Sequence, residues 1–387
     1  MSSTYDAIII GAGQAGLAAG HELARRGLKP GKDFLVLDSN KGPGGAWRHR
    51  WDSLTLGKAH GIADLPDLAM KRPDPSIPAS ILVTEYYDSY EKEFDFQVVR
   101  PVKVAQVSPT NATDPTSPLR IESTDGREWQ ARFVLNATGT WTNPYVPYIH
   151  GIGKFPGKQL HTVGYHKAED FQGQKVLVVG GGLSAVQFLL ELEDFAETIW
   201  ATRRPPNFTT REFDSGWGLA VEKAVRERTY NGKAPASVVR TTGIPQLPDY
   251  LAGVERGLIV SHGMFDEITP TGVIFGEPHV TTTSEGLGPS ANSTLAVPES
   301  WDPYPAGTHV DVDVIFWNTG FRAALRHLAP MKLRGNGTGR GIEMSDEVSP
   351  AADRRVLLVG YGSTASTVGA TRAGRVAGRV TAQRLGL

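Results

Sequence analysis

A glycine-rich turn near the start of the chain has the residue types and the spacing to bind a nucleotide. The segment Gly11-Ala12-Gly13-Gln14-Ala15-Gly16 follows the apolar run 7–10 and precedes a stretch with helical spacing of apolar residues. The first glycine allows a tight turn, the second lets the backbone approach a pyrophosphate, and the third lets the helix pack closely on the strand. The start of the helix then offers free N–H groups and a positive dipole end to phosphates.

Asp38 completes this first pattern. It ends the next apolar run, 34–37, and is followed by Ser39. A carboxylate at the end of the second strand can accept both hydroxyls of an adenosine ribose. The whole pattern therefore predicts a dinucleotide site, and a plain glycine turn is the alternative.

A second turn of the same kind follows the apolar run 176–179. In Gly180-Gly181-Gly182-Leu183-Ser184-Ala185 the third glycine is replaced by Ala185, which still permits close packing. The next apolar run ends in Thr202-Arg203-Arg204 and not in an acid. A guanidinium can hold a 2′-phosphate that a carboxylate would repel, so Arg203 and Arg204 predict NADPH rather than NADH. A solvated pair of arginines at a strand end is the alternative.

The composition limits what two nucleotide sites can do. The chain has no cysteine, which excludes a disulfide framework, a Cys-ligated zinc or iron–sulfur site, a Cys nucleophile and a redox-active Cys pair. One dinucleotide can be a flavin that stays bound, and the other a hydride donor that comes and goes. Without a cysteine pair, electrons from the flavin must pass to oxygen, to another protein or to a small acceptor.

Length and charge set further limits. The 387 residues suffice for about two domains, and 40 Lys+Arg against 41 Asp+Glu leave a net charge of −1. That balance gives no field for nucleic acid or an anionic membrane, so we expect neither partner. No apolar run reaches the ~20 residues of a membrane span, and the N-terminus lacks the features of a signal peptide. We expect a cytoplasmic protein.

The elements that must position these motifs predict an α/β fold. Apolar runs at 7–10, 34–37, 133–135, 176–179, 198–201, 312–317 and 356–359 are typical of buried parallel strands, while 100–135 alternates like an antiparallel meander. We predict two Rossmann-like dinucleotide-binding domains, with the NADPH domain inserted into the FAD domain. The predicted FAD-binding domain is 1–160 and 310–387, and the NADPH-binding domain is 161–309, with a loop-rich or helical insertion at about 205–300. Two connections are expected near 140–150 and 318–322.

Three further motifs carry a family resemblance. The segment 155–165 fits FxGxxxHxxxY just before the second glycine-rich turn, and Gly44-Gly45-Ala46-Trp47 fits GGxW. Ala137-Thr138-Gly139 and Asn318-Thr319-Gly320-Phe321 fit two ATG-type strand ends. In these motifs the sequence resembles the flavin-containing monooxygenases and their Baeyer–Villiger and N-hydroxylating relatives, over about 1–205 and 310–387. It is most similar to the short bacterial members.

The resemblance implies a reaction. FAD would be reduced by NADPH, NADP+ would stay bound, and O2 would be captured as a C4a-(hydro)peroxyflavin. This species would oxygenate a small soft nucleophile such as a sulfide or amine, or a ketone. The protein would exclude water and hold the adduct, so no acid–base triad is expected. The implied partners are a small-molecule substrate and O2, with a possible homodimer and no metal.

The motifs and the resemblance together give a set of candidate site residues. The catalytic candidates are Arg50, Asp52, His161 and Tyr165. A local surface ion pair is the alternative for the first two, and a structural role between the domains is the alternative for the last two. The candidates for cofactor binding are Gly11, Gly13, Gln14, Ala15, Gly16, Asp38, Ser39, Gly45, Ala46, Trp47, Val104, Ala137, Thr138, Gly139, Gly180, Gly182, Leu183, Ser184, Ala185, Arg203, Arg204, Thr319, Gly320 and Ser363.

The end of the chain departs from one common pattern. Many flavoproteins with two dinucleotides end their last strand in Gly-Asp, whereas this chain has Gly360-Tyr361-Gly362-Ser363. Ser363 or the following helix start would have to replace the carboxylate. Two other functions stay open: an electron-transfer reductase for a protein or quinone acceptor, and a non-catalytic flavin or nucleotide sensor that uses 205–300 as an interaction surface.

Overall fold

The computed structural model describes residues 4–59, 62–72, 74–209, 223, 225–235, 243–278, 295–334, 341–362 and 367–387. The chain forms two compact units. Unit 1 consists of Met1–Asn143, Val225–Pro235 and Ala323–Leu387, and unit 2 of Pro144–Ala224 and Ala236–Arg322. Unit 2 is therefore inserted into the sequence of unit 1, except that Val225–Pro235, within the predicted insertion of the NADPH-binding domain at about 205–300, belongs to unit 1.

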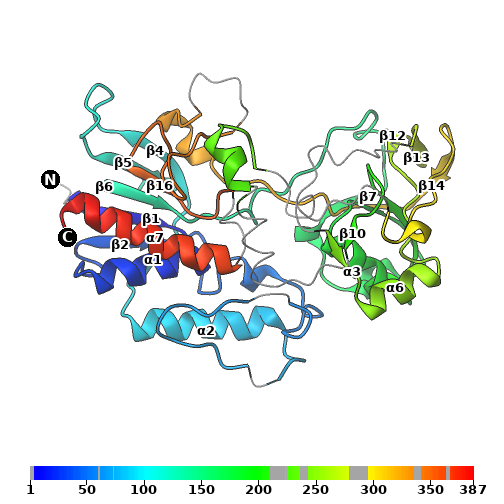
Figure 1. Ribbon diagram of the computed structural model, residues 1–387, viewed down its shortest axis with the longest axis horizontal. Coiled ribbons are helices and arrows are strands. Elements are labelled where there is room, and N and C mark those ends of the chain that lie inside the picture. Colours follow the sequence, from blue (N-terminus) through cyan, green and yellow to red (C-terminus); the bar gives the residue numbers. More distant parts are fainter. Residues whose placement is uncertain are drawn as a thin grey trace. The chain divides into compact units, whose positions relative to one another are not determined.

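Unit 1 is built on a seven-stranded sheet (Figure 1). Its strands are β1 (Thr4–Ile10), β2 (Phe34–Leu37), β3 (Val98–Val99), β4 (Val104–Pro109), β5 (Leu119–Ser123), β6 (Glu128–Asn136) and β16 (Val356–Leu358). The order is β3-β2-β1-β6-β5-β4, and β16 pairs with the end of β6. The pairs among β3, β2, β1, β6 and β16 are parallel, whereas β4, β5 and β6 pair antiparallel.

Both faces of this sheet are covered, which explains its continuous apolar runs. Ile9 and Leu135 lie in the core on one face, together with residues of α1 (Gln14–Arg25), α2 (Ala79–Glu93) and α7 (Thr367–Leu385). Ile8 and Val134 lie in a second core, shared with the meander and with η5 (Arg326–Met331).

Helices α1 and α7 pack side by side through small residues (Figure 1). A Cβ atom on Gly374 of α7 would lie 2.4 Å from the carbonyl oxygen of Ala15 in α1. A Cβ atom on Gly378 would lie 2.8 Å from the Cβ of Glu22. Glycine at these two positions thus allows the helix backbones to approach closely.

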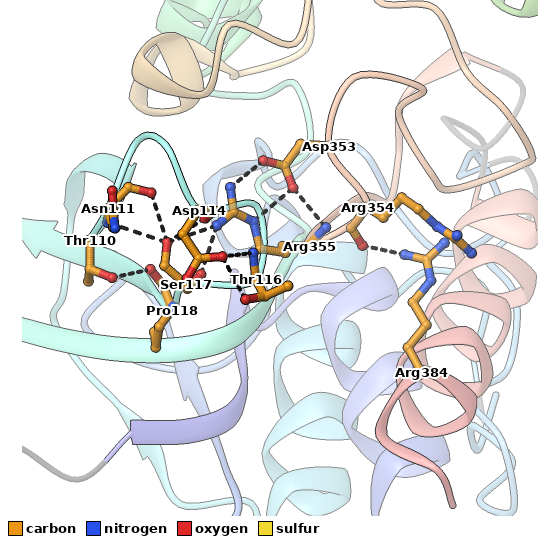
Figure 2. Close-up of polar contacts among 10 residues, drawn as sticks. All are labelled: Thr110, Asn111, Asp114, Thr116, Ser117, Pro118, Asp353, Arg354, Arg355 and Arg384. Carbon is orange, nitrogen blue, oxygen red and sulfur yellow. Dashed lines mark hydrogen bonds and ion pairs between the residues drawn. The ribbon is translucent and has the colours of Figure 1, made fainter.

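A set of polar contacts fixes the segment that leads into β16 (Figure 2). Arg355 forms a two-pronged ion pair with Asp353, at 2.7 and 3.1 Å, and donates to the carbonyl oxygen of Ser117 at 2.7 Å. Arg384 of α7 donates to the carbonyl oxygen of Arg354 and, at 2.7 Å, to the Ser349 hydroxyl. These contacts join the β4–β5 loop and α7 to the segment that precedes β16.

Unit 2 contains a four-stranded parallel sheet of order β7-β15-β8-β9. Helix α3 (Leu183–Leu192) follows β8, and a three-stranded antiparallel sheet, β12-β13-β14, shares a core with the parallel sheet. The remaining elements are α6, a β10–β11 pair and short 3-10 turns. The bounds are β7 (Lys158–His161), η2 (Thr162–Gly164), η3 (Ala168–Phe171), β8 (Lys175–Val179), β9 (Glu197–Ala201), β10 (Phe208–Thr209), β11 (Ile244–Pro245), α6 (Pro248–Glu255), β12 (Phe265–Ile268), β13 (Gly272–Phe275), η4 (Pro298–Ser300), β14 (His309–Asp311) and β15 (Val314–Trp317).

The α/β class with two Rossmann-like units is confirmed, while the unit boundaries differ from the predicted domain limits. The predicted limits at 160 and 310 assign β7 and β15 to the FAD-binding domain, but both strands pair within the unit 2 sheet. The units change at Asn143–Pro144 and Arg322–Ala323. Beside these points Pro144 forms an antiparallel bridge with Phe321, so the two connections run together.

The described residues hold neither a membrane span nor a metal-binding cluster. None of the helices among them is both long and apolar enough to cross a membrane. The same residues contain no group of three or more His, Asp or Glu side chains that could hold a metal ion.

Candidate functional site

The first glycine turn joins three strand ends of unit 1. Gly11 has φ +105° and donates its N–H to the carbonyl oxygen of Leu37, at the end of β2, at 2.7 Å. A Cβ atom on Gly11 would lie 2.4 Å from the carbonyl oxygen of Ala137, just after β6. The turn therefore requires glycine here, because both the φ angle and the contact exclude a side chain.

The other glycines of the motif have different surroundings. A Cβ atom on Gly16 would lie 1.8 Å from the carbonyl oxygen of Gly11, so this glycine serves packing. A Cβ atom on Gly13 would meet only the Cα of Gly45, at an ordinary 3.8 Å. Gly13 is the N-cap of α1, and no side chain caps that helix. The backbone over Gly13 is therefore open to an anion, as the predicted pyrophosphate site requires.

Asp38 is buried and oriented by the same turn. Its Oδ2 accepts the N–H of Ala12 at 2.8 Å, and its Oδ1 accepts the N–H of Asn40 at 2.7 Å. Arg100 Nη2 lies 4.0 Å from Oδ2 and also forms a two-pronged ion pair with Glu91, with both distances at 2.6 Å. This buried pair places a cation beside Asp38 and was not predicted from the sequence. Ser39, next in the chain, is exposed.

Gln14 has a structural environment that its position in the motif does not reveal. Its Nε2 donates to the carbonyl oxygen of Ala63 and to the Thr371 hydroxyl, both at 2.8 Å. Its Oε1 accepts a hydrogen bond from the buried Tyr87 hydroxyl. The side chain thus links α1 to α2 and α7. Because these contacts use the side-chain amide, only the backbone of Gln14 is available to a cofactor.

The remaining unit 1 candidates lie in several environments. Gly45, with φ +54°, packs its backbone on Gly13, since a Cβ atom there would lie 2.8 Å from the Gly13 Cα. Ala46 is exposed, and Ala15, Trp47 and Val104 are half-buried, with Val104 at the start of β4.

The second glycine turn repeats the geometry of the first. Gly180 has φ +134° and donates its N–H to the carbonyl oxygen of Ala201 at the end of β9, at 2.9 Å. A Cβ atom on Gly180 would lie 2.2 Å from the carbonyl oxygen of Asn318, just after β15. Leu37, Ala137 and Gly11 in unit 1 thus correspond to Ala201, Asn318 and Gly180 in unit 2.

Helix α3 begins directly after this turn. Its N-cap is Gly182, no side chain caps it, and Leu183 is its first residue. Ser184 is the second residue of the helix and does not cap it. Ser184 and Leu183 are half-buried, and Ala185 is fully buried against the sheet.

Arg203 and Arg204 follow β9 as predicted. Arg203 is exposed and Arg204 half-buried, and neither guanidinium forms an ion pair with an acid of the described residues. The loop is fixed before them, because the buried Thr202 hydroxyl is 2.6 Å from both the Arg204 carbonyl oxygen and the Ser261 hydroxyl. Both arginines therefore follow a strand end that the Thr202 hydroxyl holds by hydrogen bonds, and no acid of the described residues neutralises their charge.

In each of the two ATG-type segments, the threonine forms a hydrogen bond to the backbone close to the point where the chain changes unit. In unit 1, the Thr138 hydroxyl donates to the carbonyl oxygen of Ala324 at 2.8 Å. In unit 2, the Thr319 hydroxyl donates to the carbonyl oxygen of Tyr145. Gly139 and Gly320 have φ of +61° and +80°, and a Cβ atom on either would have no described neighbour within 4 Å, so both turns are open.

His161 and Tyr165 are part of the unit 2 core. His161 Nε2 lies 2.9 Å from the carbonyl oxygen of Gly320, and burial lowers the pKa of this imidazole. The Tyr165 hydroxyl donates to Glu191 Oε1 at 2.6 Å, and its ring packs against Phe171, Phe188 and Phe316. Burial, followed by the hydrogen bond to Glu191, raises the pKa of Tyr165. This environment favours the structural role over the catalytic one.

Arg50 and Asp52 do not form the surface ion pair considered as the alternative. Asp52 is exposed, while Arg50 is half-buried among three indole rings. The Arg50 Cζ lies 4.1 Å from the ring centroid of Trp141, 5.6 Å from that of Trp47 and 5.9 Å from that of Trp51. Trp141 was not among the predicted site residues, although it comes two positions after the Ala137-Thr138-Gly139 segment.

Ser363, predicted to replace the missing aspartate near the flavin, lies outside the described residues. Its neighbour Gly362 is described and has φ +67°.

Comparisons with known proteins agree with this geometry. A family model described as pyridine nucleotide-disulphide oxidoreductase matches residues 8–229. The flavin-containing monooxygenase from Stenotrophomonas maltophilia is similar in structure, with a TM-score of 0.74, 30% identity and coverage of 99% of both chains. Indole-3-pyruvate monooxygenase YUCCA1 from Oryza sativa is 34% identical over 48% of this chain and 44% of its own length. A Baeyer-Villiger monooxygenase from Streptomyces coelicolor is 26% identical over 85% of this chain and 66% of its own length.

The family model covers more than half of the chain, and the Stenotrophomonas structure covers nearly all of it. The chain therefore belongs to the pyridine nucleotide-disulphide oxidoreductases and, among them, to the flavin-containing monooxygenases. The region that matches the first two curated relatives covers 52% of the length of one and 56% of the length of the other, which is about half.

Proposed function

We propose that this protein is an NADPH- and O2-dependent FAD monooxygenase that oxygenates small sulfides, amines or ketones. The observation that carries the proposal is the repeated turn geometry at Gly11 and Gly180 together with its one difference. In unit 1, the strand β2 is followed by the buried Asp38. In unit 2, the corresponding strand β9 leads into Arg203 and Arg204. An acid suits a free ribose and a guanidinium suits a 2′-phosphate, so the two turns fit two different dinucleotides.

Unit 1 fits FAD. The open backbone over Gly13 and the uncapped start of α1 would meet the pyrophosphate, and Asp38 would accept the ribose hydroxyls. Arg100 and Glu91 would keep Asp38 in place. The bound flavin would supply the reaction with O2 and the transfer of an oxygen atom, which no side chain of this protein can perform.

Unit 2 fits NADPH. The uncapped start of α3 after Gly182 would face the pyrophosphate, and Arg203 with Arg204 would hold the 2′-phosphate. The chain has no cysteine to pass electrons to a disulfide. In the finer form of the proposal, which comes from the family resemblance, oxygen would be held as the C4a-(hydro)peroxyflavin, and the protein's part would be to exclude water around it.

The test is product analysis under labelled oxygen. The purified yellow protein is mixed with NADPH, ¹⁸O₂ and thioanisole, and the NADPH consumed is compared with the sulfoxide formed. We expect labelled sulfoxide in an amount close to that of the NADPH oxidised. Oxidation of NADPH coupled to one-electron acceptors, without labelled product from this sulfide or from an amine or ketone, would support the electron-transfer reductase instead.

A further inference from the structure

Arg50 is a charged group without a matching charge in the part of unit 1 that the structure describes. Its guanidinium forms no ion pair or hydrogen bond with the described residues, and its Nε is buried without a partner. Burial lowers the pKa of Arg50 to about 10, which leaves it positively charged at neutral pH. Arg50 is half-buried, and a charge that is partly removed from water in a folded protein is normally paired, so the guanidinium is suited to bind an anion.

The three indole rings stabilise the positive charge of Arg50 but do not accept hydrogen bonds from its N–H groups. Trp141 lies closest, with 4.1 Å between its ring centroid and Arg50 Cζ, a distance at which the guanidinium is attracted to the π face. The N–H groups of a guanidinium lie in its plane and point away from a ring stacked on its face. That planar set of donors matches the two oxygens of a carboxylate.

The position of Arg50 within unit 1 relates it to the predicted flavin site. Trp141 follows β6 and the open turn at Gly139, while the segment that holds Trp47 and Arg50 begins at Gly45, whose backbone packs on Gly13. Both segments therefore extend from the carboxyl edge of the parallel strands, the edge at which ligands of such sheets bind. The phosphates of a dinucleotide already have the Gly13 turn and the start of α1, so Arg50 is left for another anion.

We propose that Arg50 and its three tryptophans form a carboxylate-binding subsite, so that the preferred substrates carry a carboxylate on an apolar body. The guanidinium would hold the carboxylate through two N–H groups, and the indoles of Trp47, Trp51 and Trp141 would contact the apolar part. The inference rests on the proposed function for the reaction, but the binding of the anion is independent of turnover.

The experiment compares two sulfides that differ only in charge, 4-(methylthio)benzoate and thioanisole. For the wild type we expect kcat/KM to favour the carboxylate by roughly 10–100-fold, the size of a hydrogen-bonded charge interaction. Arg50→Gln should bring this ratio close to one, and Arg50→Lys, which keeps the charge but loses the planar donors, should give an intermediate ratio. Arg132→Gln removes an exposed arginine of unit 1 that pairs with Asp6, and should leave the ratio as in the wild type.

A second measurement needs no catalysis. Binding of benzoate to the oxidised, FAD-loaded protein is followed by calorimetry, and Arg50→Gln should weaken it by a similar factor while Arg132→Gln should not. Benzoate binding that depends on Arg50 in a protein that oxygenates nothing would support the subsite and reject the proposed function. An unchanged ratio and unchanged benzoate affinity in Arg50→Gln would overturn the subsite. Loss of FAD from Arg50→Gln but not from Arg132→Gln would also overturn it, because the guanidinium would then belong to the flavin.

Discussion

The Nε2 atom of His161 lies 2.9 Å from the carbonyl oxygen of Gly320 and donates a hydrogen bond to it. His161 is the last residue of β7, and Gly320 follows the end of the neighbouring strand β15, in the segment by which the chain leaves unit 2. The ring of His161 also meets Phe321 edge-on, with 4.9 Å between the ring centroids. His161 thus attaches the segment that leads out of unit 2 to the end of β7 in the parallel sheet of that unit.

His161→Ala should therefore act mainly on stability. Loss of a buried hydrogen bond and of the contact with Phe321 should lower the free energy of unfolding by about 1–3 kcal/mol. Denaturant unfolding followed by circular dichroism measures this, with His150→Ala as an exposed control in the same unit. Unchanged stability together with a faster decay of the oxygenated flavin would instead make His161 catalytic.

Arg203→Ala should change the choice between nicotinamide cofactors. If the guanidinium holds the 2′-phosphate, its loss should raise the KM for NADPH by roughly 10–100-fold and affect NADH little, because NADH has no such phosphate. Steady-state kinetics with both cofactors measure the effect. Arg256→Ala is the matched control, since Arg256 is a paired arginine of unit 2. Equal effects of Arg203→Ala on the two cofactors would contradict the 2′-phosphate role.

Gly13→Val should yield a folded protein without FAD. A Cβ atom at Gly13 meets only the Cα of Gly45, at 3.8 Å, so the fold can accept it. The branched side chain would, however, occupy the space over the backbone that the pyrophosphate needs. The measurement is the flavin-to-protein absorbance ratio with a circular dichroism spectrum. Gly153→Ala, at a glycine with nothing within 4 Å of its Cβ position, is the control. A yellow, FAD-replete Gly13→Val would refute the pyrophosphate assignment.

His327 should make unit 1 sensitive to acid. Its Nε2 donates to Asn136 Oδ1 at 2.6 Å, and burial lowers its pKa from 6.5 to about 4. Between these two pH values the unfolded chain binds a proton at this site that the folded chain does not, so stability rises with pH across the window and falls on acidification. The contribution is about 3 kcal/mol over the window.

The measurement is the free energy of unfolding at pH 7 and pH 4.5 for the wild type and His327→Gln. The variant should lose much of the pH dependence, whereas His150→Gln, at an exposed histidine, should keep it. Identical pH dependence in the wild type and His327→Gln would show that His327 does not carry this effect.

The strands around the nucleotide turns could be predicted well because their signal is local. The predicted run 34–37 coincides with β2, and the second glycine turn lies between β8 and α3 as expected. Helix α2 was not predicted. It is rich in aromatic residues such as Tyr86, Tyr87 and Tyr90, which are typical of strands, and packing of these rings within the core of unit 1 stabilises the helix instead.

The side-chain environments at the site could not be predicted, because their partners are distant in sequence. Gln14 lies in the glycine motif, but its amide is bonded to Ala63 and Thr371. Trp141 stacks on Arg50 from another strand end. Motif spacing identifies which backbone meets a cofactor, whereas these contacts arise only when the chain has folded.

The most direct test of the proposed monooxygenase is stopped-flow absorbance of the reduced protein with oxygen. The FAD-loaded protein is reduced with NADPH without air and then mixed with O2 in the absence of substrate. We expect a near-ultraviolet band that persists for seconds before oxidised flavin returns, as is typical of a monooxygenase site that excludes water. Immediate return of oxidised flavin, with no such band, would contradict the proposed function and indicate an oxidase or an electron-transfer reductase.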